Sequence, residues 1–196
     1  HFGYDQYAFR FLNRYLQHTG DYAGLALLRY YLVYRALVLA KVALLRRAQQ
    51  GHEAIGPKYL LYMALAERFT QKAQAALIIT HGYSGSGKST WASQLAEKIG
   101  AIQLRSDVER KRLFAYQALA NTGSGINQGL YTPLAGQQTY LRLAELARTV
   151  IDSGFTAIID AAFLKTEQRT LFRQLARECG VPFVIIDFQA SEPELG

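Results

Sequence analysis

The fold of this chain is decided by nine residues, Gly82-Tyr83-Ser84-Gly85-Ser86-Gly87-Lys88-Ser89-Thr90. They fit the phosphate-binding pattern G-x-x-x-x-G-K-[ST] at every fixed position. The apolar run 76–80 before them predicts a short buried strand, and residues 91–98 after them predict the start of a helix. Such a turn makes an anion site, because free backbone N–H groups and the helix dipole point at the same spot. The segment therefore predicts nucleotide binding, and a chance glycine-rich turn is the alternative interpretation.

The loop also predicts ATP and Mg²⁺ as the bound groups. Glycines let the backbone wrap phosphates without Cβ clashes. We expect Lys88 to reach the β- and γ-phosphates and the Ser89 hydroxyl to bind magnesium. The residues expected to hold the nucleotide are Gly82, Ser84, Gly85, Ser86, Gly87, Lys88, Ser89 and Thr90.

Composition narrows the class of protein. The chain has 196 residues, enough for one large or two small domains, and half of them are hydrophobic. The single cysteine, Cys179, excludes a disulfide framework and a cysteine-based zinc site, and it fits a reducing compartment. The net charge of +7 is concentrated in residues 1–75, with 10 basic against 4 acidic residues, whereas residues 76–196 have 12 against 11. The nearly neutral charge of the second part argues against nucleic acid as a partner.

Residues 1–75 predict an all-helical segment. We expect one helix over 5–17, a second capped by Asp21 and reaching about residue 50, and a third over about 58–75. The most apolar run, residues 30–45, is too short and too charged for a membrane span and predicts a buried core helix. We therefore expect no membrane contact and a cytoplasmic location.

Residues 76–196 alternate strand and helix, which predicts an α/β fold with a parallel sheet flanked by helices. Ligands of such sheets bind beyond the carboxyl ends of the strands. The expected strands are 77–80, 102–104, 156–159 and 183–187.

The second strand is followed by an acid and bases. Asp107 is expected either to cap the helix that starts here or to orient an acceptor hydroxyl and take its proton. Arg110, one turn on, is expected to hold an anionic group of that acceptor. The candidate catalytic residues are thus Lys88, Asp107 and Arg110.

Carboxylates also follow the third and fourth strands. Asp160 beside the phosphate loop is expected to support magnesium, and Asp187 is its rival, for which structural capping is the better interpretation. Arg169, on the helix after the third strand, is a candidate for substrate contact. Residues 121–129 are rich in turn formers and predict either a cover for the acceptor site or a plain surface loop.

These motifs together resemble a family of P-loop kinases. Residues 82–114 resemble the start of the 5′-hydroxyl polynucleotide kinase domain and of zeta-toxin-like kinases, with Arg105-Ser106-Asp107-Val108-Glu109-Arg110 as the second element. Ile158-Ile159-Asp160 with Phe163-Leu164 and Arg169 resembles the third strand and following helix of that group. The resemblance implies a P-loop kinase-like fold.

A closer resemblance is to the ATP-binding half of bacterial bifunctional proteins that join an aminoglycoside-phosphotransferase-like domain to a P-loop kinase-like domain. Tyr131-Thr132-Pro133, Thr139-Tyr140 and residues 160–164 are typical of that half. Residues 11–15 and 31–38 resemble the last helices of the phosphotransferase-like half. The resemblance implies a boundary between residues 75 and 76.

The resemblance further implies that the chain is a fragment, since it begins at His1 and stops at Gly196. The missing parts would be the N-terminal phosphotransferase-like lobes and an arginine-bearing lid. On that expectation the fragment binds nucleotide weakly and turns over slowly or not at all.

Three functions follow from these observations. The leading one is an ATP-dependent kinase that phosphorylates a hydroxyl of an unidentified acceptor. The second is a nucleotide-dependent switch or partner-binding module without its own acceptor. The third and weakest is a kinase of 5′-hydroxyl nucleic acid ends.

Overall fold

A computed structural model describes residues 5–51, 55–71, 74–120 and 133–189 of the chain. It divides into two units, one built from residues 23–73 and the other combining residues 2–22 with 74–196. Residues 121–129, which the sequence predicts to be either a cover for the acceptor site or a plain surface loop, lie outside the described residues, as do residues 190–196.

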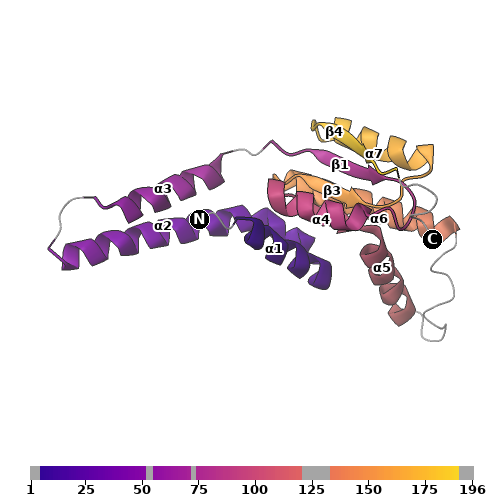
Figure 1. Cartoon of the computed structure of the whole chain (residues 1–196). Helices are drawn as coiled ribbons and strands as arrows, with labels where there is room; N and C mark the ends of the chain where they lie inside the picture. Colours follow the sequence, from indigo (N-terminus) through magenta and orange to yellow (C-terminus); the bar gives the residue numbers. More distant parts are fainter. Residues whose placement is uncertain (1–4, 52–54, 72–73, 121–132, 190–196) are drawn as a thin grey trace. The chain divides into compact units, whose positions relative to one another are not determined.

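The larger unit contains a four-stranded parallel sheet, as the sequence predicts (Figure 1). The strands lie in the order β2-β3-β1-β4, so that β1 is paired with β3 on one side and with β4 on the other. The central strands are buried and apolar, as expected for parallel strands that are covered on both faces. Their bounds are β1 Leu77–His81, β2 Ile102–Arg105, β3 Ala157–Asp160 and β4 Phe183–Asp187.

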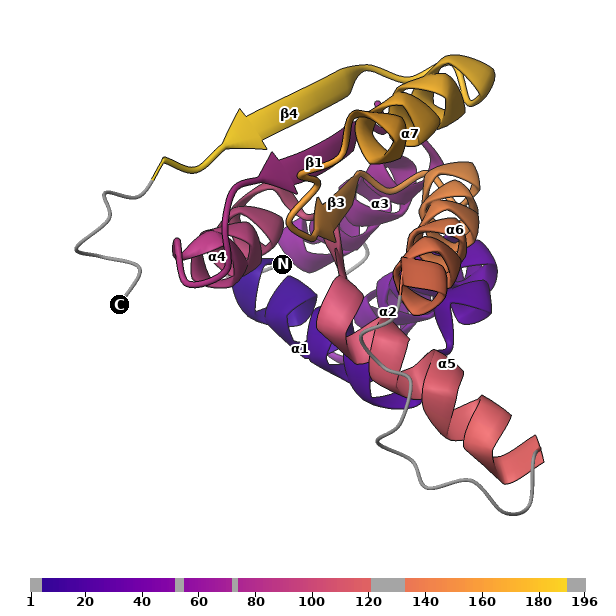
Figure 2. The same ribbon diagram turned by 90° about the vertical axis from the view of Figure 1, so that its right-hand side faces the viewer.

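Helices cover both faces of this sheet. α1 and α4 lie on one face, and α6 and α7 lie on the other (Figure 2). Under α4 a core forms from Ile78, Ala92, Ala96 and Ile158, where small helix residues let the helix approach the strands closely. The helices of this unit are α1 Asp5–Thr19, α4 Lys88–Ile99, α5 Ser106–Ala120, α6 Pro133–Asp152 and α7 Thr166–Glu178.

α1 belongs with the sheet and not with the other N-terminal helices. Arg10 forms a two-pronged ion pair with Glu97 of α4, with distances of 2.8 and 2.7 Å. The buried Asn13 side chain donates to the carbonyl of Ala101 at 2.9 Å. A boundary between residues 75 and 76 therefore separates α1 from the sheet on which it packs. The sequence does not show this contact, because α1 and β2 are far apart along the chain.

The smaller unit is a helical hairpin of α2, Leu25–Gln49, and α3, Pro57–Thr70 (Figure 1). Arg29 of α2 donates to the Phe69 carbonyl at 3.1 and 3.2 Å, which ties the start of α2 to the end of α3. α3 ends at Thr70, before the expected residue 75.

Two expectations for α2 are wrong. Asp21 does not cap it, because the 3₁₀ turn Tyr22–Gly24 intervenes and Gly24 is the N-cap residue. The helix is not a buried core helix either: its buried residues are Leu25, Ala36 and Ala40, since it packs one stripe against α3. By length and composition alone the stretch 22–49 could cross a membrane, a test that core helices of soluble proteins also pass.

Candidate nucleotide and phosphoryl-transfer site

The phosphate loop joins β1 to α4 at the carboxyl edge of the sheet. Gly82, Gly85 and Gly87 have φ angles of +136°, +88° and +77°, a region that glycine enters at little cost. Gly87 is the N-cap of α4 and has no side chain with which to cap it. The first N–H groups of a helix have no partner within the helix, so this turn presents donors to an anion.

Gly82 is needed for a second reason. A Cβ atom built on it would lie 2.6 Å from the carbonyl oxygen of Phe188, which follows β4. The N–H of Phe188 donates to the His81 carbonyl at 2.9 Å, and its ring packs edge-on against Trp91 of α4. The segment after β4 therefore supports the phosphate loop from behind and leaves room only for glycine at position 82.

Lys88 lies folded over the loop. Its Nζ donates to the Tyr83 carbonyl in a close contact and to Ser86 Oγ at 3.1 Å. Burial lowers the pKa of Lys88, and the negative charge of Asp160 opposes that shift. The ammonium is thus held by neutral oxygens of the loop, and a phosphate would supply the anionic partner that they lack.

Asp160 ends β3 beside the loop, and its side chain is only 4% exposed. Its Oδ2 accepts from Gln103 Nε2 at 3.1 Å and lies 3.6 Å from Arg105 Nε. Burial raises the pKa of Asp160, although the Ser89 hydroxyl and Arg105 stabilise the charged form. A buried carboxylate and a neighbouring serine hydroxyl supply oxygen ligands of the kind that magnesium prefers. They fit a magnesium ion that is also held by phosphate oxygens and water.

These residues do not form a metal site made of protein ligands alone. Among the described residues, no three or more His, Cys, Asp or Glu side chains gather as a metal site. Magnesium commonly binds through one or two protein groups and the substrate phosphates, so Ser89 and Asp160 suffice for it.

Asp107 lies at the same edge, one residue into α5. Arg105 Nη2 donates to its Oδ2 at 3.0 Å, while Arg105 Nε faces Asp160. One guanidinium therefore bridges the two carboxylates. The Asp107 side chain is 53% exposed, so it is open to a second substrate in a way that Asp160 is not.

The two other predicted substrate residues have different surroundings. Arg110 is half-buried and acts on Tyr140: burial raises the pKa of Tyr140, and the positive charge of Arg110 opposes that shift. Arg169 Nη1 donates to the carbonyls of Phe163 and Leu164 at 2.6 and 3.1 Å. Arg169 thus braces the turn after Asp160, where Phe163 has a φ of +52°, and much of its donor capacity is used there.

Asp187, the rival carboxylate, does not join this group. Its Oδ1 lies 2.6 Å from His81 Nδ1, and its side chain is 50% exposed. Hydrogen bonding to His81 lowers its pKa. It closes the end of β4 against β1.

Sequence reasoning missed one residue of the site, Gln103. It stands in β2 between Ile102 and Leu104, is 2% exposed and bonds to Asp160. A single polar residue inside an apolar strand was the available signal, because a buried amide is kept where it has partners.

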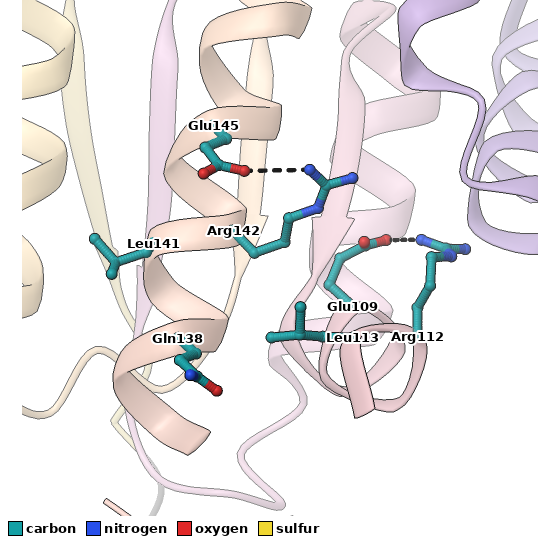
Figure 3. Close-up of a pocket in the computed structure, with 7 residues that line it drawn as sticks. All are labelled: Glu109, Arg112, Leu113, Gln138, Leu141, Arg142 and Glu145. Carbon is teal, nitrogen blue, oxygen red and sulfur yellow. Dashed lines mark hydrogen bonds and ion pairs between the residues drawn. The ribbon is translucent and has the colours of Figure 1, made fainter. Parts of the chain in front are cut away.

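A cavity of about 350 Å³ lies between α5 and α6 (Figure 3). Its wall carries two ion pairs, Glu109 with Arg112 and Arg142 with Glu145. The described residues that line it do not include the phosphate loop. Its charges are paired with one another, so it offers no free cation to a phosphate.

Comparison with known proteins identifies the family of the second part of the chain. Residues 77–196 match the model of the family described as the AAA domain. The uncharacterized protein Rv2004c of Mycobacterium tuberculosis is 30% identical over 181 residues, which are 92% of this chain and 36% of that protein. An uncharacterized protein of Mycobacterium bovis matches equally well. The chain spans little more than a third of the length of these curated relatives.

Solved structures share the fold. A protein of Chloroflexus aurantiacus whose kinase activity is inferred has a TM-score of 0.52 and 22% identity, over 62% of each chain. The protein APE1195 has a TM-score of 0.50 and 24% identity, over 62% of this chain and 64% of the other. At this identity the likeness establishes the architecture, an α/β fold with a parallel sheet flanked by helices, as the sequence predicts.

Proposed function

We propose that this chain, which belongs to the AAA domain family over residues 77–196, is the nucleotide-binding part of an ATP-dependent kinase that phosphorylates a hydroxyl. One observation carries the proposal. Arg105 joins Asp160, buried beside Ser89, to the exposed Asp107. A group that fits magnesium and a group open to an acceptor thus lie at the same edge of the sheet.

In this proposal the chain binds and orients ATP before any chemistry. The N–H groups at the start of α4 hold the phosphates, and Lys88 exchanges the Tyr83 and Ser86 oxygens for phosphoryl oxygens. Ser89 and Asp160 would hold magnesium. Bound there, it would neutralise charge on the β- and γ-phosphoryl oxygens.

The transfer step needs an acceptor hydroxyl near Asp107. Its oxygen attacks the γ-phosphorus, the bond to the β–γ bridging oxygen breaks, and ADP leaves. The hydroxyl proton passes to the Asp107 carboxylate, whose exposure leaves it accessible to the acceptor. Arg110, on the same helix, would hold an anionic group of the acceptor. Positioning and electrostatics would supply most of the acceleration.

The rest of the proposal concerns the whole protein. We propose that the α2–α3 hairpin is the end of a phosphotransferase-like domain in a longer protein, as the length of the relatives supports. Its exposed apolar residues, among them Tyr30, Tyr31 and Tyr34, would then contact that domain. A cytoplasmic location is part of the same proposal.

A specific observation favours one alternative, a nucleotide-dependent switch without an acceptor. The guanidinium groups nearest the site are occupied, since Arg105 lies on two carboxylates and Arg169 on main-chain carbonyls. A phosphoryl group in transfer from ATP would then meet less free positive charge than in an efficient kinase.

The first test is a screen for acceptor-dependent loss of ATP. Purified protein with magnesium and ATP is incubated with pooled sugars, nucleosides, antibiotics and 5′-hydroxyl oligonucleotides. One active pool identifies a kinase and its substrate class. Tight ATP binding with no active pool supports the switch instead, and activity only on oligonucleotides identifies a nucleic-acid end kinase.

The second test separates binding from transfer. Asp107→Asn is expected to keep ATP affinity and to slow transfer by about 10²- to 10⁴-fold, the usual contribution of a general base. Asp152→Asn is the matched control, the same change at the exposed end of α6. Unchanged transfer in the Asp107 variant would exclude its role as the base.

A further inference from the structure

The Gln103 side chain connects three elements around the site. Its Nε2 donates to Asp160 Oδ2 at 3.1 Å and lies 3.4 Å from the Ser89 carbonyl. Its Oε1 accepts from Ser93 Oγ of α4 at 2.9 Å and from Gln17 Nε2 of α1 at 3.3 Å. Both ends of this buried amide are therefore engaged, with its donor toward Asp160 and Ser89.

The orientation of that amide is fixed by its surroundings. If the amide were turned over, its carbonyl oxygen would face the Asp160 carboxylate and the Ser89 carbonyl, which only accept hydrogen bonds. Such contacts between acceptors are costly where water is excluded. Gln103 therefore presents an N–H to Asp160 Oδ2 and limits rotation of the carboxylate.

The backbone of Gln103 is held by α1. Its N–H donates to Asn13 Oδ1 at 2.7 Å, and Asn13 Nδ2 donates to the Ala101 carbonyl at 2.9 Å. One side chain thus takes two backbone groups that a further strand would use, the Gln103 N–H in β2 and the Ala101 carbonyl just before it. Asn13 is 6% exposed, and the Arg10–Glu97 ion pair binds the same helix to α4. α1 is locked to the strand that carries Gln103.

We propose that Gln103 is a positioning residue for Asp160 and Ser89, and that α1 sets its place through Asn13 and Gln17. The proposal rests on the proposed function, because it assigns Gln103 a part in magnesium-dependent ATP binding. α1 lies on the face of the sheet covered by α4 and contributes no residue to the phosphate loop. It acts on the site through the amide of Gln103.

The test is a magnesium titration of ATP binding by Gln103→Met. Methionine keeps the length and packing of the side chain but removes the N–H donor. Calorimetric ATP binding is measured in EDTA and at increasing MgCl₂. Loss of a residue that orients a metal-binding group typically lowers metal affinity about 10- to 100-fold. We expect the half-saturating MgCl₂ concentration to rise by about 10-fold, while binding in EDTA changes less than about threefold.

Two further variants control the test. Gln174→Met, the same change on the exposed face of α7, is expected to leave the titration unchanged. Gln17→Met removes the contact from α1 without touching β2, and we expect its MgCl₂ requirement to rise about threefold. The Gln17 variant keeps the proposal testable if Gln103→Met does not fold.

The outcomes distinguish this proposal from the proposed function. A folded Gln103→Met protein with a wild-type MgCl₂ requirement overturns the positioning role while ATP binding stands. An unchanged titration in the Gln17 variant overturns the part assigned to α1. A wild-type protein that binds no ATP at any MgCl₂ concentration overturns both.

Discussion

Two carboxylates with the same place in the sequence pattern differ in burial and in the direction in which their pKa is shifted. Asp160 and Asp187 each end a strand, and each is paired in register with a basic residue of the neighbouring strand, Arg105 and His81 respectively. Asp160 is 4% exposed and Asp187 is 50% exposed. Burial raises the pKa of the first, and hydrogen bonding to His81 lowers the pKa of the second.

The difference teaches that the position of a strand in the sheet decides what its last residue can do. β3 lies between β1 and β2, so Asp160 is enclosed by the phosphate loop, Gln103 and Arg105. β4 is an outer strand of the described sheet, and Asp187 faces water. A costly buried charge beside a phosphate loop indicates binding, whereas an exposed ion pair contributes little beyond local order.

The largest expected effect tests directly whether Asp160 and Asp187 differ in their contribution to ATP binding. In the proposed site, Asp160→Ala would remove a charged partner of magnesium and nucleotide, and losing such an interaction costs about 1.5–3 kcal/mol, or roughly 10- to 150-fold in affinity. Asp187→Ala is the matched control and is expected to change affinity less than about threefold. Calorimetric titration with ATP at saturating MgCl₂ measures both. Equal losses in the two variants would remove the distinction between the two strand ends.

The sequence predicted the sheet better than it predicted the site. Four short apolar runs and the phosphate loop define β1 to β4 and α4, because strand and loop signals are local. The contact of α1 with β2 depends on Asn13 and Ala101, which lie 88 residues apart, and no local pattern records it. The same limit hid Gln103, whose partners come from three elements.

The second prediction concerns how β4 supports the loop. Gly82→Ala places a Cβ atom 2.6 Å from the Phe188 carbonyl at a φ of +136°, whereas Cβ at Gly87 meets nothing within 4 Å. Backbone strain of this kind costs about 1–3 kcal/mol. We expect Gly82→Ala to lower the free energy of unfolding clearly more than Gly87→Ala in chemical denaturation. The reverse order would show that the segment after β4 does not constrain the loop.

The third prediction concerns the cost of burying Asp160. Its pKa is raised in the folded state, so the folded protein binds more protons than the unfolded chain, and stability falls as pH rises from the ordinary value of 3.8 through the raised one. Asn cannot ionise and avoids this loss. We expect Asp160→Asn to raise the Tm of the nucleotide-free protein at about pH 7.5, by about 2–4 °C for each kcal/mol, and less at about pH 4.

A control separates this gain from a general effect of the substitution. Asp152→Asn, at the exposed end of α6, makes the same change in charge outside the site, and we expect it to leave the Tm unchanged at both pH values. A Tm gain for Asp160→Asn that does not depend on pH would contradict the argument from burial.

The smallest expected effect is a change in Tm on Asp187→Asn, opposite in sign to the change expected for Asp160→Asn. The lowered pKa of Asp187 means that its ion pair with His81 contributes stability above the ordinary value of 3.8, and that this is lost as pH falls through the lower, folded value. Asp187→Asn should therefore lower the Tm at about pH 6 by no more than about 2 °C, because the pair is exposed, and leave ATP affinity unchanged. Asp160→Asn, by contrast, should raise the Tm and change the ATP affinity. If the two Asn variants shift Tm in the same direction, burial is not what separates these carboxylates.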